Sequence, residues 1–144
     1  MTTVDDMLER VRSVNVLQES QDAIENTRED MILIQQEQMR KGLNADGIPI
    51  GFYKRQKYAE MKNAMNPLPG LGIVDLELHG DFKRELFAEV RGEEFIIDSA
   101  DSKTKFLVDK YTDKAIGLND DSLDQYAEVV EPVFQEQIKE KLGL

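Results

Sequence analysis

Apolar residues recur at helical spacing through the first 42 residues of the chain. Residues at this spacing share one face of an α-helix, so the pattern predicts one long helix or two over residues 3–42. We favour a break at residues 13–16, because Ser and Asn compete there for backbone hydrogen bonds. The stretch 18–30 has few apolar residues and is expected to face solvent or a polar partner. The recurring apolar positions are Val4, Met7, Leu8, Val11, Leu17, Ile24, Met31 and Ile34.

The first helical region is predicted to end at Gly42, because Arg40 and Lys41 suit the negative end of a helix and glycine suits the left-handed cap. Residues 44–51 then read as a turn followed by an extended segment, since Pro49 cannot donate a ladder hydrogen bond. A short helix is expected over residues 53–64. The loop 66–72 contains two prolines and two glycines, and it is a candidate mobile or partner-contacting segment.

Alternating apolar residues predict a β-hairpin with its turn at residues 91–92. Two strands of about five residues cannot bury enough apolar surface to be stable alone. We therefore expect helices of this chain or a neighbouring subunit to cover the hairpin. The apolar positions on one face of the two strands are Leu86, Ala88, Val90, Phe95 and Ile97.

Two further helices are expected after the hairpin. Residues 98–102 offer several caps for a helix that ends near Tyr111. Residues 119–122 open the last helix, with a capping box over residues 122–125. Pro132 lies inside this helix and is expected to bend it or to mark a second start.

The order of elements predicts a single α+β domain over residues 1–144, with a helix or helix pair, a small antiparallel hairpin and a C-terminal helix packed on it. Its parts are a helical arm at 3–42; a turn, short basic helix and loop at 43–73; a hairpin and short helix at 74–118; and a closing helix at 119–144.

Composition places the chain among soluble globular proteins, with 40% hydrophobic and 33% charged residues in 144 positions. Cysteine is absent, which excludes disulfides and thiolate chemistry. The sequence contains no run of 18 apolar residues and its first residues lack a signal-peptide pattern, so we expect no membrane span and no secretion signal. The formal net charge of -11 opposes general nucleic-acid binding and fits either solubility, a surface that repels DNA, or a mimic of DNA.

Searches for catalytic and ligand-binding patterns favour structural roles. His79 is the single histidine and lies in a predicted turn. Asp98 and Asp101 lack the spacing of a calcium loop, so helix capping is the better interpretation. The sequence Gly70-Leu71-Gly72 is not followed by the Lys and Ser or Thr of a phosphate loop. We expect no enzyme activity, no cofactor and no metal.

Two candidate contact regions remain. The loop residues Pro67, Leu68, Pro69 and Leu71, with the apolar hairpin positions, form a candidate subunit or partner interface. The second region is a basic patch on the short helix, made of Lys54, Arg55, Lys57 and Lys62. We interpret the patch as a solvated face or as a site for an acidic partner rather than for nucleic acid. The methionines at 31, 39, 61 and 65 are expected to fill the core.

Several stretches resemble small virion-morphogenesis proteins of tailed bacteriophages, of the kind encoded near head-to-tail joining genes. These stretches are LNADGIPIGFY at 43–53, LELHGDF at 76–82, IIDSADSKT at 96–104 and KYTDKAIGL at 110–118, and the resemblance covers about residues 40–144. In the second stretch Gly80 permits a sharp turn and Phe82 is expected to anchor it in the core. The resemblance implies a structural protein that forms or decorates a ring between capsid portal and tail.

Two functions are therefore hypotheses. The first is a phage neck, head-to-tail connector or tail-completion protein that assembles with portal, connector or tail proteins, in a homo-oligomeric ring around the DNA channel. Such a protein would reside in the virion after assembly in the bacterial cytoplasm. The alternative is an acidic regulatory or inhibitory protein that binds a basic protein surface as a DNA mimic does. This alternative requires carboxylates in rows on one face.

Overall fold

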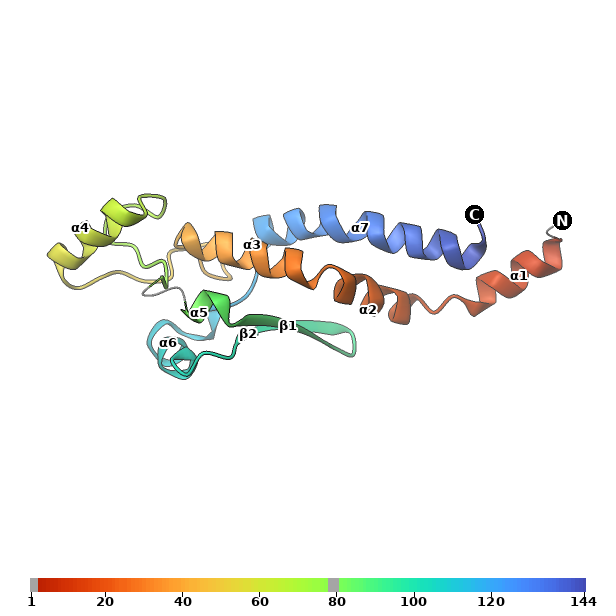
Figure 1. Cartoon of the computed structure of the whole chain (residues 1–144), viewed down its shortest axis with the longest axis horizontal. Coiled ribbons are helices and arrows are strands. Elements are labelled where there is room, and N and C mark those ends of the chain that lie inside the picture. Colours follow the sequence, from red (N-terminus) through yellow and green to blue (C-terminus); the bar gives the residue numbers. More distant parts are fainter. Residues whose placement is uncertain (1–2, 78–80) are drawn as a thin grey trace.

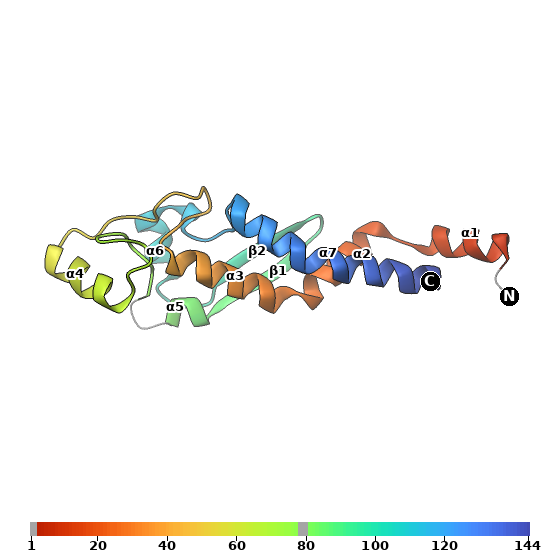
Figure 2. The ribbon, with the colours of Figure 1, turned by 90° about the horizontal axis from the view of Figure 1, so that it is seen from above.

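The computed structural model describes residues 3–77 and 81–144, which form an elongated molecule (Figure 1). Its fold class is α+β, as predicted. Figures 1 and 2 place α1 and the end of α7 at one end of the long axis and α4 at the other. The antiparallel strands are β1 (Leu86–Arg91) and β2 (Glu94–Ser99). The helices are α1 (Val4–Ser13), α2 (Val16–Asn26), α3 (Arg28–Arg40), α4 (Gln56–Met65), α5 (Asp81–Arg84), α6 (Thr104–Tyr111) and α7 (Asp120–Leu142), and a 3₁₀ turn spans Asp113–Ala115.

The N-terminal arm is divided into α1, α2 and α3. The predicted break at residues 13–16 is confirmed, because α1 ends at Ser13 and the Asn15 side chain accepts a hydrogen bond from the Gln18 N–H to cap α2. A second break, which the sequence pattern did not predict, lies at Thr27. Its hydroxyl donates to the Ala23 carbonyl at 2.8 Å, so the side chain competes with the helical backbone bonds at this point.

Helix α7 packs along α2 and α3 (Figures 1 and 2). Residues 18–30 were expected to face solvent or a polar partner, and the second alternative holds for the inner positions, since Glu19, Ala23 and Thr27 are buried. Their polar atoms find partners on α7 instead of water: Gln137 Nε2 donates to a Glu19 carboxylate oxygen at 3.0 Å. Thr27 Oγ1 lies 2.7 Å from the Tyr126 hydroxyl.

The start of α7 lies one turn earlier than the predicted capping box. Asn119 is the cap residue, and its side chain accepts a hydrogen bond from the Ser122 N–H at 2.9 Å. Ser122 is therefore already helical. The helix continues through Pro132 as one element, so no second helix starts there.

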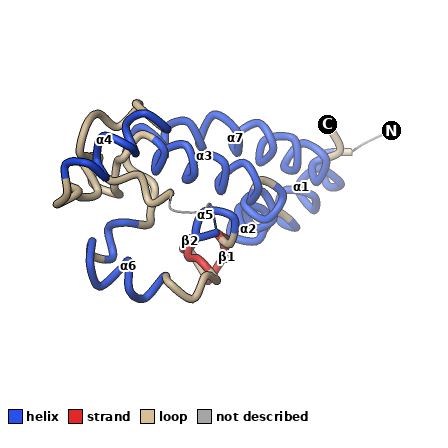
Figure 3. Tube along the Cα trace, turned by 60° about the vertical axis from the view of Figure 1, so that its left-hand side comes forward, coloured by secondary structure: helices blue, strands red, loops and turns tan. Residues whose placement is uncertain are grey.

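The hairpin pairs Val90 with Phe95 and Ala88 with Ile97, which places the predicted apolar positions on one face. The tight turn itself is Gly92–Glu93, because Arg91 still pairs with Glu94. Helices α2 and α3 contact β1, and Figure 3 shows the strands beside them. Helices of the same chain thus supply the cover that a two-stranded sheet requires.

The core consists of two neighbouring apolar clusters. One consists of buried residues between Met39 and Ala115, and Phe82 is buried in it as predicted. The other joins Met31, Ala88 and Tyr126. Met31 and Met39 are fully buried, but Met61 and Met65 are 49% and 69% exposed, so the core-filling expectation was wrong for these two.

The extended segment before α4 runs beside the chain that follows the loop 66–72. Tyr53 N–H donates to the Gly72 carbonyl, and Val74 N–H donates to the Gly51 carbonyl. Gly42 ends α3 in the left-handed conformation that the sequence predicted, with φ +76. His79 and Gly80 lie outside the described residues. Among the helices that are described, none has both the length and the apolar character needed to cross a bilayer.

Candidate functional site

The hairpin candidates serve mainly the chain's own core. Leu86 and Ala88 are buried, so they are not available to a neighbouring subunit. Val90, Phe95 and Ile97 are half-buried, and the Phe95 ring meets the Tyr126 ring edge to face at 6.0 Å. The sequence left open whether helices or a subunit cover this face, and α2, α3 and α7 already cover most of it.

The loop candidates remain accessible. Leu68 and Leu71 are 53% and 61% exposed, Pro67 is exposed and Pro69 is half-buried. Glycines 70 and 72 adopt positive φ, which lets the loop turn sharply. The loop therefore presents apolar side chains to solvent at the α4 end of the molecule.

The basic patch is smaller than the sequence predicted. Lys54, Arg55 and Lys57 are exposed, whereas Lys62 is buried in the last turn of α4. Lys62 Nζ lies 3.0 Å from an Asp75 carboxylate oxygen and also donates to the Glu77 carbonyl. Lys62 is thus a structural cation, and the candidate contact patch is reduced to the other three residues.

Asp75 is the centre of a buried polar network that fixes α4 to the segment 74–77. Asn66 Nδ2 donates to its carboxylate at 3.1 Å, and the Glu77 N–H donates at 3.0 Å. Burial opposes ionisation of this carboxyl, but the bonds from Asn66, Glu77 and Lys62 outweigh it and hold the pKa of Asp75 below its ordinary value. Asp75 is therefore ionised at neutral pH.

Two further groups extend the network. The Tyr53 hydroxyl lies 3.4 Å from Asp75 Oδ1, and burial together with this carboxylate raises the pKa of Tyr53. Lys83 of α5 lies 3.5 Å from the Glu77 carboxylate. Burial lowers the pKa of Lys83, and the nearby carboxylates of Glu77 and Asp75 only partly oppose this effect.

A cleft of about 240 Å³ adjoins this network, since Tyr53 and Glu77 also line it, and it is lined by aromatic rings and cations. The Tyr53 and Tyr58 rings meet at 5.1 Å and 82°, and Lys110 Nζ lies 5.1 Å from the Tyr111 ring centroid. Rings and cations of this kind bind anionic and apolar groups. The lining residues are Phe52, Tyr53, Lys54, Arg55, Tyr58, Val74, Leu76, Glu77, Lys110 and Tyr111.

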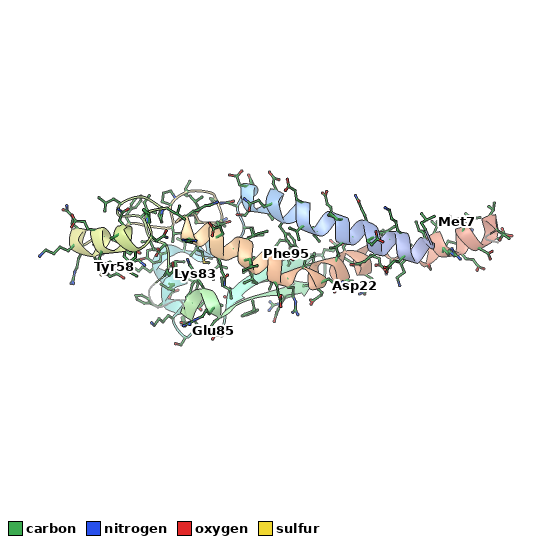
Figure 4. The ribbon with its side chains drawn as sticks, turned by 45° about the horizontal axis from the view of Figure 1, so that its top comes forward. Met7, Asp22, Tyr58, Lys83, Glu85 and Phe95 are labelled. Carbon is green, nitrogen blue, oxygen red and sulfur yellow. The ribbon has the colours of Figure 1, made fainter. Side chains whose placement is uncertain are left out.

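A second uncovered surface lies on α1 at the opposite end. No residue of α1 is buried, and Val4, Leu8 and Val11 are 77%, 45% and 54% exposed. Arg10 Nη1 donates to the Leu142 carbonyl at 3.1 Å and ties α1 to the end of α7. Figure 4 shows Met7 on α1 and Tyr58 on α4 far apart along the molecule. The helical spacing of the apolar residues 4–11 indicated an apolar face, but the sequence did not show whether anything covers it.

Within residues 3–77 and 81–144, no cluster of three or more His, Asp or Glu side chains is placed to hold a metal ion. The predicted capping of α6 by residues 98–102 was wrong, because the cap residue is Lys103 and no side chain caps the helix. Asp98 and Asp101 instead accept hydrogen bonds from the backbone N–H groups of Ser99 and Lys103 in the turn before α6. Comparisons of the chain with protein-family models, curated proteins and solved structures found no match.

Proposed function

We propose that this chain is a structural protein of a tailed-phage virion, located in the neck, head-to-tail connector or tail-completion region, and that it acts by assembly. The single observation that supports an assembly role is the exposure of apolar side chains at both ends of an elongated molecule. Removing apolar side chains from water lowers the free energy by roughly 25 cal/mol per Å² of buried surface. Clustered exposed apolar residues therefore favour a surface that a partner covers.

The α4 end carries several exposed large apolar side chains. Phe52, Met65 and Leu71 are 68%, 69% and 61% exposed, and Phe52 lines the same cleft as Lys54 and Arg55. This combination suits a partner that is both apolar and acidic. Portal, connector or tail proteins are the partners that the resemblance of residues 43–53, 96–104 and 110–118 supports.

The net charge of -11 supports a place beside packaged DNA. A negative surface repels the phosphate backbone, so DNA passes such a protein without adhering to it. In this proposal the chain carries no enzymatic activity and needs no cofactor.

The DNA-mimic alternative has weaker support. Exposed carboxylates occur on α1, α3, both strands, α6 and α7, for example at Asp5, Glu37, Glu89, Glu94 and Asp109. A mimic requires them in rows on one face. The alternative would regain support if the chain competed with DNA for a basic protein.

Mass measurement of the purified protein, alone and mixed with portal and connector proteins of a tailed phage, tests the proposal. We expect a stable complex with one of them. Leu71→Asp should weaken this complex, whereas Leu33→Asp, a matched change on α3 at a residue that is 62% exposed, should leave it intact. A chain that stays monomeric and binds no virion protein would contradict the proposed function.

A further inference from the structure

We infer that copies of this chain associate head to tail, with α1 of one copy docked on the α4 end of the next. The inference rests on the assembly role proposed above and identifies the surfaces that would meet. A second copy is the occupant that charge and shape favour, because the two uncovered ends of one molecule complement each other.

The first surface is the apolar stripe of α1 with its flanking carboxylates. Val4, Leu8 and Val11 lie at helical spacing and are all exposed. Asp5 and Glu9 lie one position further along and are also exposed. Asp5, Asp6 and Glu9 outnumber Arg10 and Arg12 on this helix, so α1 combines the apolar stripe with a small net negative charge.

The second surface is the α4 end, where Phe52, Met65 and Leu71 expose apolar side chains. Lys54 and Arg55 line the same cleft as Phe52, Lys57 is exposed in the first turn of α4, and Glu60 is the single acidic residue in the sequence from 52 to 65. Glu77 also lines the cleft, but Lys83 lies 3.5 Å from its carboxylate. In a chain with a net charge of -11, this end is locally positive.

The geometry of the molecule makes the contact heterologous. α1 and α4 lie at opposite ends of the long axis in Figures 1, 2 and 4, so the two surfaces of one copy cannot meet each other. A contact between different surfaces repeats from copy to copy and closes a ring when the rotation allows. Side-by-side contact would instead bring acidic bodies together, and like charges oppose it.

Two charge-reversed proteins test the contact. Lys54→Glu with Lys57→Glu reverses the α4 end, and Asp5→Lys with Glu9→Lys reverses α1. Asp6 is left unchanged because it closes the capping box with Thr3. The control is Lys103→Glu with Lys105→Glu, which changes the same number of exposed charges on and before α6. Sedimentation velocity at low salt measures the oligomer in each case, and circular dichroism confirms folding.

We expect the wild type and the control to form oligomers that weaken as salt screens the charges. Each reversed protein alone should lose association by at least about tenfold. An equimolar mixture of the two should regain it, because each reversed surface then meets an opposite charge. This recovery excludes misfolding as the cause of the loss.

Two results would overturn the inference: a wild type that remains monomeric, or oligomers that persist in both reversed proteins alone. Failure of the mixture to recover association also counts against it. Binding of portal or connector protein, measured separately on the same samples, decides the proposed function independently. A chain that binds portal but does not associate with itself would keep the function and refute this contact.

Discussion

Replacing Asp75 with asparagine removes the negative charge that faces the buried Lys62 ammonium. The two side chains are 3% and 7% exposed and lie 3.0 Å apart. Water therefore screens neither charge well, and the pair differs from surface ion pairs that contribute little. The substitution leaves the volume of residue 75 almost unchanged, so the effect measured is the loss of the charge and of the oxygen that accepts from Asn66 Nδ2.

The expected loss of stability follows from the partners that remain. Removing one member of a buried ion pair costs about 3–5 kcal/mol, because the other charge stays buried without compensation. Lys62 keeps its hydrogen bond to the Glu77 carbonyl, and residue 75 keeps an oxygen for the Glu77 N–H. We therefore expect the lower end of that range, about 3 kcal/mol.

Urea unfolding followed by circular dichroism measures this loss at neutral pH. The control is Glu89→Gln, which breaks the exposed pair with Arg91 and should cost less than about 1 kcal/mol. The double substitution Lys62→Met with Asp75→Asn removes the stranded charge and should recover much of the stability. The reasoning would be refuted if the Asp75→Asn protein were as stable as the Glu89→Gln protein. It would also be refuted if the double substitution lost as much free energy of unfolding as the two single substitutions added together.

Three further outcomes are expected. The difference in unfolding free energy between the wild type and Asp75→Asn should be largest above about pH 4, the ordinary pKa of an aspartate, and should vanish as pH falls through the lowered pKa of Asp75. Urea unfolding at several pH values measures this difference. It would show no such loss if the pKa of the carboxyl were unperturbed. Gly42→Ala should lower the melting temperature, because an added Cβ at φ +76 would lie 2.7 Å from Pro69, with backbone strain alone worth about 1–2 kcal/mol; an unchanged melting temperature would contradict this geometry. Asn119→Ala should lower the free energy of unfolding by about 1 kcal/mol, because it removes the cap of α7. Asn119→Asp keeps a capping oxygen and should retain most of that stability. Equal losses of stability in both proteins would exclude capping as the cause.

Local patterns predicted the elements whose formation depends on neighbouring residues. The hairpin, the end of α3 at Gly42 and the break before Asn15 follow from alternation, glycine and capping, and all are confirmed. The break at Thr27 was missed, because its hydroxyl also meets Tyr126, a residue 99 positions away. The burial of Gln35 and Gln38 was missed for the same reason, since both bond to backbone near residue 117.

The site was predicted only in part. Lys57 and Lys62 are both basic and share α4, but at about 100° per residue they lie about 140° apart around the helix. One therefore faces solvent and the other meets Asp75, a partner that no local pattern identifies. The exposed face of α1 was likewise invisible in sequence, because amphipathic spacing shows which side is apolar but not whether anything covers it.

The late position of α7 in the chain has a consequence for synthesis. The cluster of Met31, Ala88 and Tyr126 takes its last member from α7. The hydrogen bonds that dock this helix and its cap residue join residues 81 to 132 positions apart. A growing or truncated chain that ends after Leu118 would expose Ala23 and Met31, both fully buried in the folded protein. Such a product would be prone to aggregation and to degradation until the final helix is made.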